Sequence, residues 1–342
     1  MRLLLFTQAL DTNDPILSVY HQWIAEFAKH FEFITVICLK KGAYNLPGNV
    51  RVLSLGKEED KNRLGYMVRF YKYIFIEKYD SVFIHMNQEY ILLGGIFWKI
   101  LGKKIYMWRN HHAGSVLTDI AVAFCTRVFC TSKFSYTAKY RKTIIMPVGV
   151  DTDFFVRKQE IIKIPHSILF LSRIAPVKKP HIFIEALKLL RARGINFKAN
   201  IYGDSLDRDR EYHGDLKKKV KEAGLSDSVV FYDGIPNSET VRAYNSHEIF
   251  VNLSSSGMYD KTIFEAMACE TLTLATNKNL EELVPQSFIA QEDDAENIAL
   301  QLEKLLAFPL IEKMTWGTEL RRIAVGRHSL RELGNKLATL VS

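Results

Sequence analysis

The sequence is poor in cysteine and has no long apolar run. Its four cysteines are Cys38, Cys125, Cys130 and Cys269. No two of them form a Cys-x-x-Cys pair and no His-x-x-x-His lies nearby, so zinc and dithiol redox sites lack their spacing. The apolar run from Ile91 to Trp98 is far shorter than the ~20 residues of a membrane-spanning helix. We therefore expect free thiols and a cytoplasmic protein without a membrane span.

Repeats and low-complexity tracts are also absent from the sequence. The first apolar residues are too few for a signal peptide, and Asp11 and Asp14 follow at once, so we expect a buried first strand. The 342 residues are 48% hydrophobic and 25% charged, which is ordinary globular composition. This length predicts two domains or one large one.

Positive charge is concentrated in one half of the chain. The formal net charge is +8, and residues 1–150 hold 20 Lys and Arg against 11 Asp and Glu. The remaining residues hold 26 against 27 and are nearly neutral. A basic half favours an anionic partner, which can be nucleic acid, a membrane surface or a phosphorylated ligand.

Short apolar runs alternate with helical patterns throughout the chain. Runs without in/out alternation are typical of parallel strands covered on both faces, and their alternation with helices predicts doubly wound α/β sheets. In the first half we expect strands at Leu3–Thr7, Phe33–Leu39, Val50–Leu55, Ser81–Met86, Lys104–Trp108, Val128–Thr131 and Ile144–Val148, with helices at Ile16–Phe31, Gly65–Glu77 and Tyr90–Leu101. The pattern restarts with strands at Ser167–Leu171, Lys198–Tyr202, Val229–Tyr232, Ile249–Leu253 and Thr271–Ala275, and with helices at Pro180–Arg193, Leu206–Ala223, Ser238–Asn245 and Thr262–Cys269.

This restart predicts two Rossmann-like domains with a crevice between the carboxyl ends of their strands. We place the first domain at residues 1–155, the second at 156–318, and a linker at 153–165. Residues 319–342 are expected to form a helix that crosses back to the first domain. Ligands of open α/β sheets bind where strands end, so the loops that follow strands are the candidate sites.

Three of these loops contain charged or polar residues suited to binding or catalysis. Residues 254–269 read SSSGMYDKTIFEAMAC, in which a small polar loop leads into a helix. The helix N-terminus and Lys261 suit a phosphate, and Glu265 one turn later suits sugar hydroxyl groups. Arg173 and Lys178 follow a strand in the second loop, where two cations can clamp a pyrophosphate. Arg109, His111 and His112 follow a strand in the third loop.

The chain resembles the retaining glycosyltransferases of family 4, which have the two-domain GT-B architecture. The resemblance covers almost the whole chain and is most specific in residues 167–280. It rests on the following segments: Arg and Lys five residues apart at 173 and 178, Ile-Tyr-Gly-Asp at 201–204, Val-Val-Phe-Tyr-Asp-Gly at 229–234, Glu-Ala-Met-Ala-Cys at 265–269, and Gly-Val-Asp-Thr at 149–152.

The resemblance implies a retaining transfer of a hexose from a UDP- or GDP-sugar to a glycan or lipid-linked acceptor. Arg173 and Lys178 would hold the donor diphosphate, Glu265 the ribose hydroxyls, and backbone near Ile235 the base. His111 would lie beside the donor sugar and stabilise the oxocarbenium-like transition state. The predicted donor site is completed by Gly203, Gly257, Met258, Lys261 and Thr262.

The chain departs from the family pattern in two loops. The family has a first Glu eight residues before the second, and that position is Gly257 here, so we expect Asp260 or Lys261 to contact the sugar instead. The first loop lacks the family's glycine pair, and Asp11, Asn13 and Asp14 are predicted to meet acceptor hydroxyls unless Asn13 or Asp14 caps the next helix. The predicted acceptor side is completed by His85 and Arg109.

The expected mechanism is electrostatic. Cations and a helix N-terminus stabilise the leaving diphosphate, which itself takes the acceptor's proton, so neither a covalent nucleophile nor a metal cofactor is expected. A metal-dependent transferase would use an Asp-x-Asp, and the two candidates lie at Asp151–Asp153, near the domain join, and at Asp207–Asp209, in a predicted helix. A sugar-nucleotide epimerase and, less favoured because no motif supports it, a nucleic-acid-binding protein are the alternatives.

The basic half also suits an anionic membrane. Residues 66–78 and 95–104 are aromatic, basic and helical in pattern, which fits either an interfacial helix or a core helix whose lysines reach solvent. We expect a cytoplasmic protein that can rest on the inner membrane face, with an acceptor that is anionic, pyrophosphate-linked or presented on an acidic bilayer.

Overall fold

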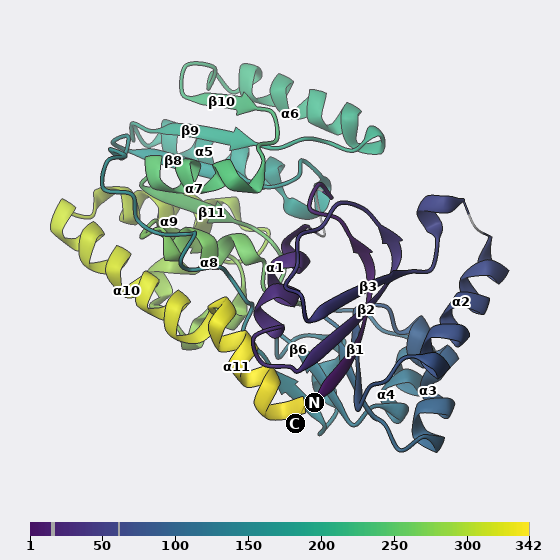
Figure 1. The fold of residues 1–342 in the computed structure, drawn as a ribbon. Helices are drawn as coiled ribbons and strands as arrows, with labels where there is room; N and C mark the ends of the chain where they lie inside the picture. Colours follow the sequence, from purple (N-terminus) through teal and green to yellow (C-terminus); the bar gives the residue numbers. More distant parts are fainter. Residues whose placement is uncertain (15–17, 61, 342) are drawn as a thin grey trace. The chain divides into compact units, whose positions relative to one another are not determined.

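The computed structural model describes residues 1–14, 18–60 and 62–341 and forms two compact units. Unit 1 contains Met1–Gly149 together with the chain from Leu330 onward, and unit 2 contains Val150–Ser329. Each unit is a parallel β-sheet covered by helices, as Figure 1 shows.

The sheet of unit 1 is parallel throughout, in the order β3-β2-β1-β4-β5-β6-β7. Its strands are β1 (Arg2–Leu10), β2 (Phe33–Lys41), β3 (Val50–Ser54), β4 (Ser81–His85), β5 (Lys104–Trp108), β6 (Arg127–Cys130) and β7 (Thr143–Ile145). The sequence-predicted strands therefore all form, with ends shifted by a few residues.

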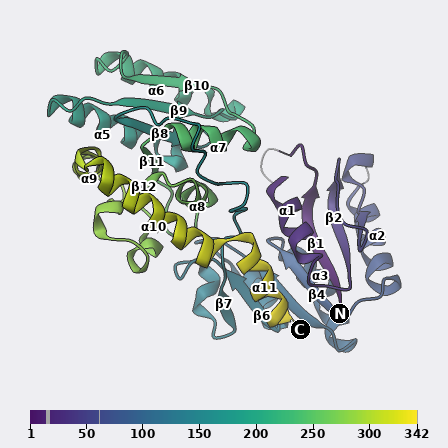
Figure 2. The ribbon, with the colours of Figure 1, turned by 60° about the vertical axis from the view of Figure 1, so that its left-hand side comes forward.

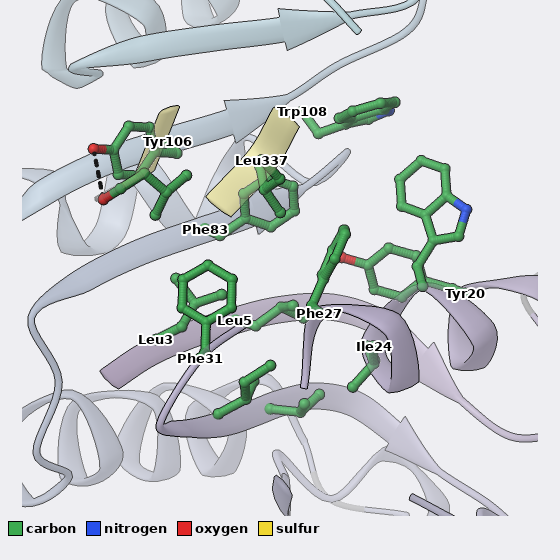
Figure 3. Packing of buried hydrophobic residues seen from close by; sticks show 14 of the residues in the cluster. Leu3, Leu5, Tyr20, Ile24, Phe27, Phe31, Phe83, Tyr106, Trp108 and Leu337 are labelled. Carbon is green, nitrogen blue, oxygen red and sulfur yellow. Dashed lines mark hydrogen bonds between the residues drawn. The ribbon is translucent and has the colours of Figure 1, made fainter. Parts of the chain in front are cut away.

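Two separate hydrophobic cores cover the two faces of this sheet. Along β1, Leu3 and Leu5 point into one core, and Leu4 and Phe6 into the other. The first core is closed by α1 (Ser18–Phe27) and α11 (Leu330–Val341). Figure 3 shows Leu337 of α11 inside it. The second is closed by α2 (Arg63–Ile76), α3 (Glu89–Ile100) and α4 (Val116–Phe124).

The sheet of unit 2 is also parallel, in the order β10-β9-β8-β11-β12. Its strands are β8 (Ser167–Leu171), β9 (Lys198–Tyr202), β10 (Val229–Tyr232), β11 (Ile249–Asn252) and β12 (Leu272–Ala275). Its helices are α5 (Pro180–Ala192), α6 (Arg210–Glu222), α7 (Asn237–Ser246), α8 (Lys261–Ala268), α9 (Ala295–Ala307) and α10 (Leu310–His328). Helix α5 packs with α6 and α9, and α8 packs with α7 and α10 (Figure 2).

The chain passes from unit 1 to unit 2 earlier than the sequence predicted, and it returns to unit 1 later. The expected linker at 153–165 belongs to unit 2, because Asn245 of α7 binds it: Asn245 Oδ1 accepts from the Lys158 amide at 2.7 Å and its Nδ2 donates to Val156 O at 2.9 Å. Arg321 of α10 likewise donates to Phe155 O at 3.0 Å. The boundary at 155 was therefore wrong, and the passage lies at Gly149–Val150.

The expected return of residues 319–342 also needs correction. Helix α10 stays with unit 2 as far as His328, held by the nearly buried Lys313–Glu248 ion pair at 2.8 Å and by contacts with α8. Only α11 returns to unit 1, where it packs on α1.

Within the described residues, two α-helices were not predicted. They are α4 and α9, and a short 3-10 helix at Asp207–Asp209 precedes α6 where one long helix was expected. The first two residues of the helix expected from Ile16 lie outside the described residues. Over the part of the chain that the structure describes, the search for a helix long and apolar enough to cross a bilayer found none.

Candidate active site

The candidate site is built at the carboxyl edge of the unit 2 sheet. Strand β8 pairs with β9 on one side and with β11 on the other, so the strand order reverses between β8 and β11. Ligands of open α/β sheets bind at such a switch point, beyond the carboxyl ends of the strands. The loops that follow β8 and β11 hold Arg173, Lys178 and residues 253–260.

Lys178 and Asp260 join these two loops. Lys178 Nζ lies 2.5 Å from Asp260 Oδ2 and 3.1 Å from Ser254 Oγ, and Ser254 Oγ donates to the same carboxylate oxygen at 3.0 Å. The Lys178 side chain is 27% exposed and that of Asp260 16%. A cation and a carboxylate separated by 82 residues in sequence thus meet at the switch point, with one side accessible to solvent.

Asp260 also caps helix α8. Its Oδ1 accepts from the Thr262 amide at 3.3 Å and from Thr262 Oγ1 at 3.0 Å, and Thr262 in turn accepts from Asn252 Nδ2 at 3.0 Å. Burial would raise the pKa of Asp260, but the charge of Lys178 and the hydrogen bonds from Lys178, Thr262 and Ser254 bring it well below its usual range. Asp260 is therefore ionised, and it holds the N-terminus of α8 and the Lys178 ammonium together.

One turn into α8, Lys261 and Glu265 form a second charged pair. Glu265 is 6% exposed, and its Oε2 accepts from Tyr244 Oη at 3.1 Å. Burial raises the pKa of Glu265 to about 7 despite the charge of Lys261 and the Tyr244 hydrogen bond. Burial lowers the pKa of Lys261 to about 8, opposed by the carboxylates of Glu265, Asp151 and Asp260. The carboxyl group of Glu265 therefore changes its charge near neutral pH. Groups with such a pKa are frequent at functional sites.

Arg173 lies on the same edge with its side chain exposed, and no described residue pairs with its guanidinium. Beside it, Gly203 has φ 152°, and a Cβ there would lie 1.9 Å from the carbonyl oxygen of Ser172. Only glycine therefore lets the loop after β9 touch the loop after β8. Asp204 continues this contact, since its carbonyl accepts from the Ile174 amide at 2.9 Å.

The loop that carries Ile235 is tied to the same edge, because Asp204 Oδ1 accepts from the Gly234 amide at 2.9 Å. Ile235 is half-buried. Arg173, Gly203 and Ile235 thus lie on three successive loops, after β8, β9 and β10, that are hydrogen-bonded to one another.

The loop from 254 to 259 is fixed by the segment that follows β12. Asn277 Nδ2 donates to Met258 O at 2.8 Å, Asn279 Nδ2 donates to Ser256 O at 2.8 Å, and Tyr259 Oη donates to Asn279 O at 2.6 Å. Gly257 is buried in this loop, while the side chain of Met258 is exposed. All predicted donor-site residues therefore lie on the carboxyl edge of one sheet.

The predicted residues of unit 1 lie at the carboxyl edge of their own sheet. His111 is exposed after β5; its Nδ1 accepts from the Ala113 amide at 3.0 Å, and its ring stacks on His112 at 4.6 Å. The Arg109 Nε is buried and has no hydrogen-bond partner among the described residues. The role of His111 toward a donor sugar stays a prediction.

The remaining predicted acceptor residues have structural contacts. His85 ends β4, and its ring stacks on Tyr20 with 3.9 Å between centroids. Asp11 Oδ1 accepts from the Asn13 amide at 3.0 Å, and its carboxyl group packs against Gly42. Helix α1 begins at Ser18, and the residues directly before it lie outside the described residues, so a cap by Asn13 or Asp14 stays untested.

Sequence reasoning missed two side chains of this site. Ser254 lies directly after β11, a position that could have marked it, and it binds both Lys178 and Asp260. Tyr244, at the end of α7, carries no signal in the sequence for its contact with Glu265. Within the described residues, the search for a group of three or more His, Cys, Asp or Glu able to hold a metal ion found none.

The match to a protein family lies in unit 2. Residues 151–319 match the model of the family described as glycosyl transferases group 1. D-inositol 3-phosphate glycosyltransferase of Paenarthrobacter aurescens (strain TC1) is 32% identical over 152 residues, which are 42% of this chain and 36% of that protein. Alpha-monoglucosyldiacylglycerol synthase of Streptococcus pneumoniae is 28% identical over 208 residues, 55% of this chain and 45% of that protein. The chain thus matches less than half the length of these relatives.

Solved structures match the whole chain. Anabaena HepE in complex with UDP has a TM-score of 0.80 at 18% identity, over 100% of this chain and 99% of that one. A glycosyltransferase from Rickettsia africae ESF-5 has a TM-score of 0.75 at 14% identity, over 99% and 97%. The two parallel sheets with their helices therefore form the α/β GT-B fold. Residues 151–319, which make up most of unit 2, are thus similar to the glycosyl transferases group 1 family.

Proposed function

We propose that the protein is a retaining glycosyltransferase that moves a hexose from a UDP- or GDP-sugar to a glycan or lipid-linked acceptor. The observation that carries the proposal is the junction of Lys178, Asp260 and Ser254 at the switch point of the unit 2 sheet, with ionisable Glu265 one helical turn away. A nucleoside diphosphate needs a cation for its phosphates and, close by, a carboxylate for its ribose hydroxyls.

The charges at this edge suit a leaving diphosphate. Among the described residues, Arg173 has no ion-pair partner, whereas Lys178 is paired with Asp260. The charge of Glu265 raises the pKa of Lys261. Bound phosphate oxygens replace water around Arg173 and Lys178 and accept hydrogen bonds near the N-terminus of α8. As the glycosidic bond breaks, negative charge grows on the diphosphate, and these fixed cations stabilise it more than they stabilise the intact donor.

Glu265 is proposed to bind the ribose hydroxyls in its ionised form, with Tyr244 orienting the carboxylate. Ionised Glu265 accepts two hydroxyl hydrogen bonds, which a protonated carboxyl group cannot do equally well. Backbone near Ile235 is proposed to contact the base. Support for a uridine nucleotide comes from HepE, whose structure contains UDP.

Retention is proposed to proceed on one face of the sugar. The leaving phosphate takes the acceptor's proton, His111 assists at the sugar, and no metal is needed. The acceptor side is assigned to unit 1 at Asp11, Asn13, His85 and Arg109. A lipid-linked acceptor is supported by the partial match to alpha-monoglucosyldiacylglycerol synthase.

A donor screen tests the proposal. Nucleotide release is measured with UDP-glucose, UDP-galactose, UDP-N-acetylglucosamine and GDP-mannose, with and without EDTA, for the wild type, Arg173→Ala and Glu265→Ala. Lys221→Ala, an exposed cation of α6, is the matched control. We expect one donor to be turned over in EDTA and both site variants to lose at least tenfold in kcat/KM. If both variants match the wild type, the site assignment is wrong. If the donor sugar is epimerised without being transferred, the protein is an epimerase instead of a transferase.

A further inference from the structure

The helices α2, α3 and α4 are apolar on both of their faces. In α2, Phe70 and Ile74 are buried in the core of unit 1, whereas Leu64, Val68 and Phe75 form an outward stripe and are 68%, 62% and 56% exposed. A surface helix of a globular protein normally carries polar residues on its outward face. An apolar outward face therefore indicates that something covers it.

The outward apolar face continues over the two neighbouring helices. Ile100 of α3 is 76% exposed and Val116 of α4 is 72% exposed. The three helices form one layer, because Phe75 of α2 contacts Phe97 of α3 with 5.5 Å between ring centroids, and α3 packs against α4. Figure 1 labels the three helices beside the sheet of unit 1. We call this exposed layer the α2–α4 face.

The charges of these helices are mainly positive, with the cations on α2 and α3 against the two acidic residues Glu89 of α3 and Asp119 of α4. Helix α2 carries Arg63, Arg69 and Lys72 and no acidic residue. Arg69 is paired with Glu59 at 2.6 Å, while Arg63 and Lys72 are exposed. Lys99 is exposed on α3. Apolar side chains interleaved with exposed cations fit a surface that is apolar inside and anionic at its boundary.

We propose that the α2–α4 face docks on an anionic lipid bilayer. Outward side chains such as Val68 and Ile100 enter the boundary between head groups and acyl chains, and Lys72 and Lys99 reach the lipid phosphates. A second copy of the chain is a poorer occupant, because a two-fold contact of this face would bring the cations of α2 against one another. The proposal does not depend on the sugar-transfer activity, since it concerns a surface remote in sequence from the donor loops.

Vesicle binding of the full chain tests this proposal without any sugar nucleotide. The probes are vesicles of phosphatidylcholine alone and of phosphatidylcholine with phosphatidylglycerol, and cosedimentation gives the affinity. The variants are Val68→Asp and Ile100→Asp. Ile311→Asp is the matched control, because this isoleucine of α10 is 79% exposed on unit 2. Thermal unfolding checks that each variant is folded.

We expect binding to the anionic vesicles only, weakened by salt. Each aspartate variant should bind at least tenfold more weakly, Lys72→Ala about fivefold more weakly, and the control like the wild type. Equal binding to both vesicle types, no binding at all, or unchanged binding of folded Val68→Asp and Ile100→Asp would overturn the proposal. A dimer that these variants convert to a monomer, without vesicle binding, would assign the face to a second copy instead.

Discussion

At the scale of single residues, Lys178 is the central cation of the proposed donor site. Its ammonium contacts Asp260 and Ser254, whereas its neighbour Lys179 contacts Glu292 and Asp293 at 2.7 and 2.8 Å. Two adjacent lysines of one loop are thus committed to different partners. This makes Lys179 a matched control for Lys178.

We predict that Lys178→Ala weakens UDP binding by about 10- to 100-fold, the loss of a charge-assisted hydrogen bond to phosphate worth about 1.5–3 kcal/mol. Lys179→Ala should leave UDP binding within about twofold of the wild type, because its ammonium is paired with Glu292 and Asp293. Isothermal titration calorimetry measures both. Equal losses of UDP affinity in the two variants would mean that binding depends on the conformation of the loop rather than on the Lys178 ammonium.

If Glu265 binds the donor as proposed, donor binding should depend on pH. Its pKa is raised to about 7, so raising the pH from 6.0 to 7.5 converts mostly neutral Glu265 into mostly ionised Glu265. If ribose binds the ionised form, the affinity for UDP-glucose should rise up to about eightfold over this interval. The phosphates of UDP-glucose do not titrate in this range, so the change reports the protein.

The variant Glu265→Gln should bind UDP-glucose more weakly at pH 7.5 and show no rise between the two pH values. Glu239→Gln, which changes an exposed carboxylate of α7, is the control and should keep the wild-type rise. A rise that survives in Glu265→Gln would assign the titration to another group.

The sequence shows which residue types lie after the strands but not which of them touch. Arg173 and Lys178 could be placed after a strand, and Glu265 in the helix that follows another polar loop, because a strand that ends in a polar loop is a local pattern. The contact of Lys178 with Asp260 spans 82 residues, and that of Tyr244 with Glu265 spans 21, so each depends on strand order in the sheet. The pKa of Glu265 follows from burial, which local sequence does not determine.

At the scale of elements, the strands were predictable because burial on both faces leaves short runs of Val, Ile, Leu and Phe. Strands β8, β9 and β10 form with the predicted bounds. Helix α4 was missed because Val116, Leu117 and Ile120 face outward, so the apolar residues do not keep to one helical face. The exposed apolar side chains that prevented the prediction of α4 are also part of the α2–α4 face.

The contact between the β8 and β9 loops predicts the effect of a small substitution. Gly203→Ala would place a Cβ 1.9 Å from Ser172 O, so the loops must separate, and we expect a loss of about 2–4 kcal/mol in the free energy of unfolding. Gly214→Ala in α6 is the control: its Cβ meets nothing within 4 Å, and we expect a gain of about 0.5–1 kcal/mol. Urea unfolding measures both values. A stable Gly203→Ala protein would show that the loops are not tightly joined.

At the scale of the whole molecule, the chain leaves unit 1 at Gly149 and re-enters it at Leu330. Gly149 has φ 76°, and its carbonyl accepts from Trp23 Nε1 at 3.1 Å. A Cβ at this position would lie 2.4 Å from Leu333 Cδ2 of α11. The point of departure, helix α1 and the returning helix α11 therefore pack together, which accounts for the glycine in the Gly-Val-Asp-Thr segment. The sequence predicted the return, but not that one short helix makes it.

The return of α11 implies that the last residues of the chain stabilise its first domain. Leu337 is fully buried in the core of unit 1, with Phe27, Phe83 and Trp108 in the same cluster. Leu337→Ala should lower the free energy of unfolding of unit 1 by about 2–5 kcal/mol through the cavity it leaves. Asn335→Ala, on the exposed side of α11, should change it by less than about 0.5 kcal/mol.

Tryptophan fluorescence during urea unfolding can follow this change, because Trp23, Trp98 and Trp108 are buried in unit 1 and only Trp316 lies in unit 2. The main fluorescence transition of Leu337→Ala should move to lower urea, while UDP, whose proposed site is in unit 2, should still bind it. If the transition stays at the wild-type midpoint, α11 does not complete the core of unit 1. If UDP binding is lost at urea concentrations where the variant is folded, the last helix serves the donor site rather than the fold of the first domain.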